Sequence, residues 1–341
     1  MLAAVVHGKS LRLQKKPLPR LAPGWALVRV RLAGICNTDL EILRGYHNFR
    51  GTPGHEFVGE VVRTAASPGH NQKAADGWIG RRVVGEINVT CCGLGLLPAC
   101  ATCRRGYTTH CEKRRVLGII GLDGAFAEYL ALPLVNLHRV PENVPDEVAV
   151  FTEPLAAACE ILEQVDLSKC SLAAVLGDGK LAQLIARVLA ASRLEVTMYG
   201  RHASKLAAAS EAGIKTRLVR RGGAVKIPNT GYELVVEATG SPQGLAQAIT
   251  MTAPRGTLVL KSTFHGAAQL ETWPIVVKEI TVVGSRCGPF APAIKLLAST
   301  KLASGKIDPR PLITRVFPLR DAPAAIHAAQ EKEVLKVLLK P

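Results

Sequence analysis

The pattern of hydrophobic and polar residues in the first part of the chain, up to about residue 147, is typical of β-strands separated by turns. Val28 to Leu32 alternates apolar and charged side chains, and Phe57 to Val62 is a short apolar run, so both are predicted strands. Met1 to His7 is predicted as a first strand rather than a secretory signal, because it lacks a basic start followed by a long apolar stretch. Thr64 to Gly77 is small and polar, which predicts a surface loop.

The pattern changes near Glu147, and from there to about Gly284 predicted strands alternate with predicted helices. Such alternation predicts an α/β fold with a doubly wound parallel sheet and helices on both faces. Residues 291 to 341 are predicted to hold one helix and some strands and to return to the first domain. The predicted strands are 172–176, 196–199, 234–236, 257–260 and 280–283, and the predicted helices are 180–192 and 203–212.

A glycine-rich turn follows the first of these strands. Gly177, Gly179 and Ala182 form the pattern G-x-G-x-x-A between the strand and an amphipathic helix that begins with Lys180 and Leu181. The first glycine permits the tight turn, the second lets the backbone approach a pyrophosphate, and the helix N-terminus offers free N–H groups. This context predicts a dinucleotide site.

The end of the second strand bears on the choice between NAD and NADP. An acidic residue normally stands there and takes the ribose hydroxyls, but here the strand ends in Gly200 and Arg201. Gly200 leaves room for a bulky group, and Arg201, with Lys205 one turn further on, suits a phosphate monoester. We therefore predict a preference for NADP(H) over NAD(H), the alternative being that Arg201 is only a surface charge.

Composition and charge narrow the class of protein. The chain has 341 residues, which favours two domains, and no stretch of about 18 apolar residues, so no membrane span is expected. Its 43 basic and 27 acidic residues give a net charge of +16, which raises the question of nucleic acid. Aromatic residues make up only 4% and do not interleave with the basic groups, so a solvated basic surface is the better interpretation and no nucleic-acid partner is expected.

Five of the nine cysteines lie close together, which is typical of metal thiolates in a reducing compartment such as the cytoplasm. Four thiolates close a tetrahedral Zn²⁺ shell and leave no open position, so a structural zinc is predicted in a lobe at about 91–111. Only one of the first two cysteines is needed, because an insertion, Gly93 to Ala99, separates this pair from the rest. The candidate ligands are Cys91 or Cys92, together with Cys100, Cys103 and Cys111.

A second set of metal-binding residue types is spread over the chain. Cys36, His55, Glu56 and Glu153 would make a mixed shell with room for water or substrate, which is the composition of a catalytic zinc site. Spacing alone leaves the alternative that Cys36 is a small buried core residue and His55 a structural histidine.

Several motifs together resemble the zinc-containing medium-chain dehydrogenase/reductase family, which includes alcohol, sorbitol and threonine dehydrogenases. The match spans nearly the whole chain. The motifs are GICNTD (34–39), GTPGHEFVGEV (51–61), the cysteine lobe, GAFAEY (124–129), TEPLA (152–156), VLGDGKLA (175–182), VVEATGS (235–241) and EITVVGSRCG (279–288).

The resemblance implies a GroES-like catalytic domain at 1–147 and 285–341 and a Rossmann domain at 148–284. It implies Cys36 and His55 as zinc ligands, with Glu56 and Glu153 as direct or water-linked ligands. Thr38 would hydrogen-bond the substrate oxygen and relay its proton, with Glu56 as a second catalytic residue. Thr239 and Arg286, in matching motifs, would join the cofactor site. The small-molecule substrate would be an alcohol or carbonyl compound, and relatives are homo-oligomers, dimers or tetramers.

The chain departs from the family pattern at Glu41 and Arg315, where histidine is common, at the insertion in the cysteine lobe, and at Ala182. Two other functions stay open from the sequence. A zinc-free quinone or enoyl reductase of the same fold would lack the Cys36, His55 and Glu153 set. A basic zinc protein that binds nucleic acid would leave the dinucleotide loop unexplained.

Overall fold

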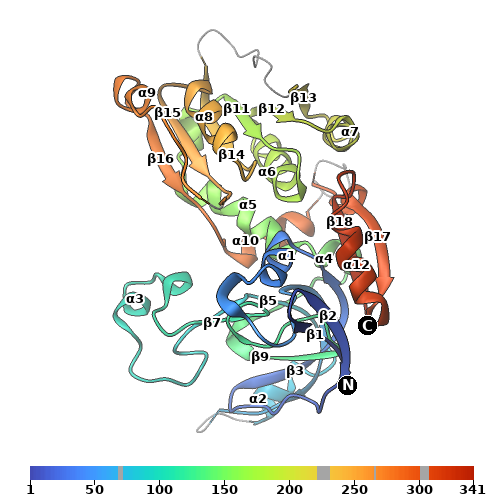
Figure 1. Cartoon of the computed structure of the whole chain (residues 1–341). Helices are drawn as coiled ribbons and strands as arrows, with labels where there is room; N and C mark the ends of the chain where they lie inside the picture. Colours follow the sequence, from blue (N-terminus) through green and yellow to red (C-terminus); the bar gives the residue numbers. More distant parts are fainter. Residues whose placement is uncertain (68–71, 221–230, 265, 300–306) are drawn as a thin grey trace. The chain divides into compact units, whose positions relative to one another are not determined.

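The structure, a computed structural model, describes residues 1–67, 72–220, 231–264, 266–299 and 307–341. Contacts divide the chain into two compact units, Met1–Glu153 with Ile313–Pro341, and Pro154–Leu312 (Figure 1). Residues 285–312 group with the second unit in this division, whereas the predicted domain boundary lies at 284/285. Among the described residues, no helix is both long and apolar enough to cross a membrane.

The first unit is built on a seven-stranded sheet with the order β10-β5-β4-β3-β18-β17, in which β9 also pairs with β3. Two smaller sheets, β1-β2 and β6-β7-β8, complete it. The strands are β1 Leu2–His7, β2 Ser10–Lys15, β3 Trp25–Gly34, β4 Glu56–Thr64, β5 Arg82–Gly85, β6 Asn88–Val89, β7 Arg115–Leu117, β8 Gly121–Leu122, β9 Tyr129–Pro133, β10 Leu137–Arg139, β17 Ile313–Pro318 and β18 Lys336–Lys340.

The order of this sheet places the C-terminal strand beside an early one. Strand β18 pairs antiparallel with β3, with Leu338 opposite Gly34, and β3 pairs with β4, with Gly34 opposite Glu56. Residues far apart in the chain thus meet at the end of β3. The helices of the unit are short: α1 Asn37–Leu43, α2 Gln72–Asp76, α3 Ala101–Arg104, α4 Asp146–Ala149 and α12 Ala322–Ala328, with 3-10 turns at Tyr46–Asn48, Thr108–His110, Leu134–Asn136 and Leu319–Asp321.

The prediction of a surface loop from Thr64 to Gly77 is wrong in part, because α2 occupies Gln72–Asp76. The amide of Gln72 donates to Asp76, four residues on, at 2.7 Å, and the Thr64 hydroxyl donates to the same carboxylate at 2.8 Å. Hydrogen bonds between polar side chains thus support one helical turn in a segment whose sequence has no apolar periodicity to predict a helix.

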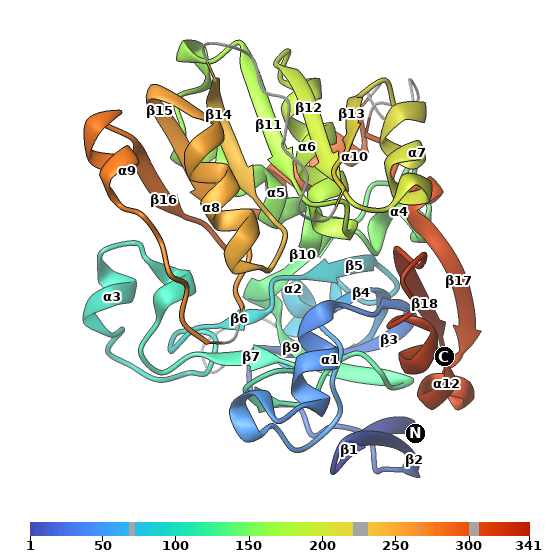
Figure 2. The ribbon, with the colours of Figure 1, turned by 45° about the horizontal axis from the view of Figure 1, so that its top comes forward.

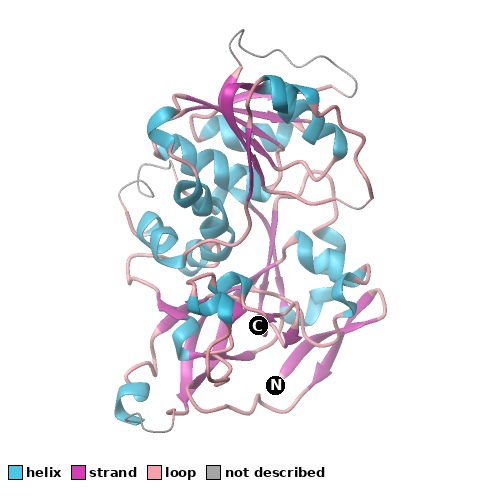
Figure 3. Cartoon of the chain, turned by 90° about the vertical axis from the view of Figure 1, so that its left-hand side faces the viewer, coloured by secondary structure: helices cyan, strands magenta, loops and turns pink. Residues whose placement is uncertain are grey.

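The second unit is a Rossmann fold, as predicted. Its six strands are all parallel in the order β13-β12-β11-β14-β15-β16, the strand order 3-2-1-4-5-6 of dinucleotide-binding sheets (Figure 2). Figure 3 shows helices on either side of these strands. The strands are β11 Leu172–Leu176, β12 Glu195–Gly200, β13 Lys215–Leu218, β14 Tyr232–Glu237, β15 Thr252–Leu260 and β16 Thr281–Gly284.

The helices of this unit follow the predicted apolar spacing. Helix α6 buries Leu184, Ile185, Val188 and Leu189, the residues whose spacing predicted it, and the polar side chains of Gln183 and Arg187 are buried as well. The chain from residue 291 on holds two α-helices among its described residues, α10 and α12, rather than the one predicted. The helices of the second unit are α5 Thr152–Gln164, which starts at the boundary of the units, α6 Lys180–Ala191, α7 Ala203–Glu211, α8 Pro242–Met251, α9 Trp273–Val277 and α10 Phe290–Leu297, with 3-10 turns at Leu167–Lys169 and Arg310–Leu312.

Candidate metal centres and cofactor site

Four cysteines of the lobe between β6 and β7 come together. The Sγ atoms of Cys91, Cys100, Cys103 and Cys111 all lie within 4.8 Å of one another, and the lobe extends beside the strands of the first unit (Figures 1 and 2). Cys92 does not join them and is exposed. The Sγ atoms of Cys100 and Cys111 are 3.8 Å apart. A tetrahedral zinc shell with Zn–S bonds of about 2.3 Å separates neighbouring sulfurs by about 3.8 Å, so the group fits Zn²⁺.

The backbone of the lobe favours thiolates. The amide of Cys91 donates to the Sγ of Cys111 at 3.2 Å, and the amide of Cys100 donates to the Sγ of Cys91 at 3.4 Å. Hydrogen bonds from the amides of Cys103 and Glu112 lower the pKa of Cys100 to about 6, and the amide of Cys100 lowers the pKa of Cys91. Burial, followed by hydrogen bonding with the neighbouring cysteines, raises the pKa of Cys103. Removing all four protons together therefore calls for a bound cation.

The second predicted set is partly assembled. One ligand atom each of Cys36, His55 and Glu56 lies within 4.8 Å of the others, at the start of α1 and the start of β4. His55 and Glu56 are buried, and Cys36 is half-buried. Glu153 does not belong to this close group; it is half-buried and makes contacts of its own.

His55 is held by a buried carboxylate. Asp39 is fully buried and accepts hydrogen bonds from the amides of Cys36 at 2.8 Å and Gly54 at 3.1 Å. Gly54 has φ +95°, a conformation that L side chains rarely adopt, and the next residue is His55. Asp39 therefore holds the backbone at Cys36 and at Gly54, the residue before His55. One side chain thus positions both candidate ligands.

The ring of His55 has an unsatisfied nitrogen. Its Nδ1 lies 3.4 Å from the Asp39 carboxylate but makes no hydrogen bond within the described residues. Burial lowers the pKa of His55, but the charges of Asp39 and Cys36 outweigh it and raise the pKa well above its ordinary value. A carboxylate behind Nδ1 leaves Nε2 for a metal, as in carboxylate–histidine–zinc arrangements, so thiolate, imidazole and carboxylate together fit Zn²⁺.

Thr38 lies beside this group. Its hydroxyl Oγ1 is 3.7 Å from the Sγ of Cys36, and the residue is half-buried on the first turn of α1. A hydroxyl at this place can both donate and accept a hydrogen bond, as a proton relay requires.

The glycine-rich turn has the geometry expected of a phosphate site. Gly177 has φ +118°, and a Cβ there would lie 2.5 Å from the carbonyl oxygen of Ala238. Gly179 is the N-cap of α6 with no side-chain cap, and a Cβ there would meet nothing within 4 Å. There is thus room beside Gly179 for an anion at the start of α6, where Lys180 and Leu181 follow and helix N–H groups gather.

The other candidate cofactor residues lie at the carboxyl ends of the strands. Gly200 ends β12, Arg201 is exposed just beyond it, and Lys205 is half-buried on α7. Thr239 follows β14 and gives its hydroxyl to Glu237 at 2.5 Å, while the carbonyl of Arg286 accepts a hydrogen bond from Lys261 at 2.7 Å. Ligands of open α/β sheets bind at this edge.

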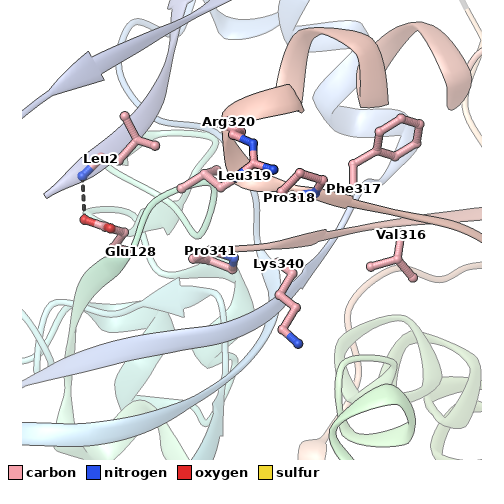
Figure 4. Close-up of a pocket in the computed structure, with 9 residues that line it drawn as sticks. All are labelled: Leu2, Glu128, Val316, Phe317, Pro318, Leu319, Arg320, Lys340 and Pro341. Carbon is pink, nitrogen blue, oxygen red and sulfur yellow. Dashed lines mark hydrogen bonds between the residues drawn. The ribbon is translucent and has the colours of Figure 1, made fainter.

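A hollow in the first unit lies away from these residues. It has a volume of about 470 Å³ and lies beside β17, with Phe317, Arg320 and Lys340 among its lining residues (Figure 4). None of the predicted site residues lines this hollow, so it is separate from the candidate metal and cofactor sites.

Comparison with known proteins decides the family. A family model described as alcohol dehydrogenase GroES-like domain matches residues 22–142, and one described as zinc-binding dehydrogenase matches residues 179–299. The chain is 30% identical to an erythritol/L-threitol dehydrogenase of Mycolicibacterium smegmatis over 371 aligned positions, covering 100% of this chain and 98% of that protein. The chain belongs to the zinc-type medium-chain alcohol dehydrogenase family.

Other proteins similar to this chain agree with the assignment. A sorbitol dehydrogenase of Halalkalibacterium halodurans is 28% identical, with 100% of this chain and 98% of that protein covered. A protein of Sinorhizobium meliloti described as a zinc-binding dehydrogenase bound to NADP has a TM-score of 0.86 at 26% identity, and the alignment covers 100% and 99% of the two chains. A short chain alcohol dehydrogenase from Escherichia coli complexed with NADH has a TM-score of 0.85 at 27% identity, with the same coverage.

Sequence reasoning missed a buried cation in this alcohol dehydrogenase-like chain. Lys336, at the start of β18, is fully buried and forms an ion pair with Glu56, which is 1% exposed. Its ammonium also lies 5.5 Å from the ring centroid of Phe151. Lys336 therefore fixes the carboxylate of one candidate ligand and balances its charge.

Replacing Lys336 with methionine should destabilise the protein by about 3 kcal/mol, because it leaves the buried Glu56 carboxylate without its cation. Urea denaturation of the zinc-loaded chain measures this. Lys340→Met, at an exposed position of the same strand, is the matched control and should change stability by less than about 0.5 kcal/mol. Adding Glu56→Gln to Lys336→Met should recover part of the loss. Equal stability of Lys336→Met and the control would contradict the role given to the pair.

Proposed function

We propose that this family member is a zinc-dependent oxidoreductase that transfers a hydride between NADP(H) and an alcohol or carbonyl substrate. The observation that carries the proposal is the close group of Cys36, His55 and Glu56 in a chain that also has a dinucleotide-type turn. A mixed thiolate, imidazole and carboxylate set is the composition of a catalytic rather than a structural zinc site. The rival zinc-free reductase has no use for such a set.

In this proposal Cys36 and His55 hold a catalytic zinc, with Glu56 or Glu153 as the carboxylate. Bound there, the ion would supply Lewis acidity that stabilises negative charge on the substrate oxygen. Thr38, half-buried beside Cys36, accepts the substrate hydroxyl proton and passes it towards solvent. Cys91, Cys100, Cys103 and Cys111 hold a second, structural zinc, and Cys92 does not take part.

The nicotinamide cofactor supplies the hydride chemistry, and the second unit positions it. We propose that the start of α6, at Gly179 and Lys180, binds the pyrophosphate, and that Arg201 with Lys205 binds a 2′-phosphate. One of the similar structures described above is bound to NADP and another is complexed with NADH. The preference proposed for this chain therefore rests on Arg201.

The substrate class we propose first is a polyol or the matching ketose, because two relatives are named sorbitol and erythritol/L-threitol dehydrogenase. The test is cofactor-linked turnover over a panel of polyols, secondary alcohols and carbonyl compounds, with NADPH and NADH side by side and zinc content measured. We expect two zinc ions per chain and higher kcat/KM with NADP(H).

Arg201→Ala should lower kcat/KM for NADPH by about tenfold and leave that for NADH within about twofold. Higher efficiency of the unmodified chain with NADH would contradict the cofactor preference, and one zinc or none would favour the zinc-free reductase.

We also propose a homo-oligomer built on the edge of the parallel sheet. Strand β16 ends the strand order, and apolar side chains of α9 and β16 are exposed there: Trp273 60%, Val276 73%, Val277 71% and Val282 44%. An exposed strand edge with neighbouring apolar side chains is a liability unless a second chain covers it.

Val276→Glu should therefore shift the protein towards the monomer in size-exclusion chromatography with light scattering, because a charge would enter the interface. Val135→Glu, at a valine of the first unit that is 79% exposed, is the control and should leave the mass unchanged. An unchanged mass of Val276→Glu at low micromolar concentration would place the interface elsewhere.

The free thiols of all nine cysteines agree with a reducing compartment, for which we propose the cytoplasm.

A further inference from the structure

A carboxylate from the glycine-rich turn reaches the end of the neighbouring strand. Asp178 stands between Gly177 and Gly179, and its Oδ2 accepts hydrogen bonds from the amides of Arg201 at 2.6 Å and His202 at 2.8 Å. The ring nitrogen Nδ1 of His202 lies 3.0 Å from the same oxygen. The side chain of Asp178 is 11% exposed, so it is anchored against the protein while its edge still meets solvent.

Gly200 is matched to this carboxylate. A Cβ on Gly200 would lie 2.6 Å from the Cβ of Asp178 and 2.7 Å from its Oδ2, distances that real Cβ atoms do not show. The space beside Gly200, which the sequence suggested was left for a bulky ligand group, is therefore already filled by Asp178. The glycine at the strand end and the aspartate in the turn form one structural unit.

The carboxylate of Asp178 lies at a position where it can contact a bound cofactor. The end of the second strand is where dinucleotide-binding sheets place the acid that takes the ribose hydroxyls. Strand β12 is that second strand, and it carries no acid at its end, but the Asp178 carboxylate lies on the first two amides beyond it. The acid is thus present in space although it is absent from the expected place in the sequence.

We propose that Asp178 is a specificity-determining residue that sets the ratio of affinities for NADP(H) and NAD(H), in opposition to Arg201. A 2′-phosphate carries about −1.5 to −2 charges, so a carboxylate at the strand end repels it. A ribose hydroxyl can instead donate to the remaining lone pair of Asp178 Oδ1, whose other neighbour is the Nδ1 of His202 at 3.2 Å. Arg201 and Lys205 act in the opposite direction. This inference rests on the proposed use of a nicotinamide cofactor, but not on which of the two is preferred.

A purely structural role for Asp178 makes a different prediction. If the carboxylate only ties the turn to the strand end, its loss would weaken the binding of both cofactors alike, because both need the same turn and the same start of α6. A charge that faces the ribose changes the two affinities in opposite directions or by very different factors. The ratio of the two dissociation constants separates these roles.

The experiment measures the Kd of NADPH and NADH by fluorescence titration on the full, zinc-loaded chain. Asp178→Asn keeps the shape and an oxygen that can accept from both amides, but removes the charge. We expect the ratio of the Kd for NADH to the Kd for NADPH to rise at least tenfold. Glu195→Gln is the control: it removes one negative charge at the other end of β12, about 17 Å away, and should change the ratio by less than twofold.

A change of less than threefold in the ratio for Asp178→Asn, or an equal change in both Kd values, would overturn the inference. Asp178→Ala, which keeps the Cβ packed on Gly200, is measured in the same way and should shift the ratio in the same direction. Failure of both variants to fold would assign Asp178 a structural role only and would also overturn it. If the unmodified chain binds NADH more tightly than NADPH, the proposed preference is wrong, but the shift in ratio still decides the role of Asp178.

Discussion

Replacing Cys36 with alanine should abolish the catalytic zinc site and lower kcat/KM by about 1,000-fold or more. Metal-ion stabilisation of a reacting oxygen is worth several kcal/mol, and about 4 kcal/mol corresponds to this factor. Of the remaining members of the group, the Glu56 carboxylate is paired with Lys336, and His55 offers only Nε2, because Asp39 lies 3.4 Å from its Nδ1. These two side chains alone are a poor shell for Zn²⁺.

The fold should survive this change, because Cys36 is the N-cap of α1, contributes no side chain to the buried face of that helix, and is only half-buried. Zinc content should fall from two ions to one per chain, with the thermal midpoint changed by no more than about 4 °C. Cys170→Ala, at a half-buried cysteine of the second unit, is the control and should keep both ions and full activity. Turnover of Cys36→Ala within about tenfold of the unmodified chain would refute the catalytic role.

Replacing Cys103 with serine should remove the other zinc and unfold the lobe at 91–111. The lobe has little apolar core of its own, with only Cys91, Gly93 and Cys111 buried between these residues. Structural zinc contributes about 10–16 kcal/mol of binding free energy in small domains, and such a segment has nothing else to replace it. We expect rapid proteolysis within the lobe, aggregation on heating, and a thermal midpoint at least about 5 °C lower.

Cys92 supplies the matched control for this experiment. It is adjacent to Cys91 in the chain but exposed and outside the group of four sulfurs. Cys92→Ser should retain two zinc ions and the original melting temperature, whereas Cys91→Ser should behave like Cys103→Ser. The reverse result would show that the first ligand is Cys92. Unchanged melting of Cys103→Ser would argue against any structural metal in the lobe.

Most of the fold could be predicted from local patterns in the sequence. The strand at 172–176 and the helix after it could be predicted because an apolar run, two glycines and helical spacing follow one another within 20 residues. The helix at Gln72–Asp76 could not, because it depends on hydrogen bonds between polar side chains rather than on an apolar face.

Less of the candidate site could be predicted from the sequence, because the contacts that support it join residues far apart in the chain. Lys336 and Glu56 are 280 positions apart, and no local pattern links them before the order of the sheet is known. Asp178 occupies a variable position of the glycine-rich pattern, so its contact with the end of β12 appears only when the two strands are parallel neighbours. Cys91 and Cys92 are adjacent in the sequence, and only the folded chain distinguishes them, because Cys91 is buried in the group of four sulfurs and Cys92 is exposed outside it.

The position of β18 beside β3 has a consequence for the order of synthesis. The first unit cannot complete its sheet until residues 336–340 have left the ribosome, well after the segment 154–312 that forms the other unit. During this interval the nascent chain carries Cys36, His55 and the Glu56 carboxylate without the ammonium group that later neutralises it. Early zinc uptake would therefore occur on an open, more acidic set of side chains, and the arrival of β18 would close it.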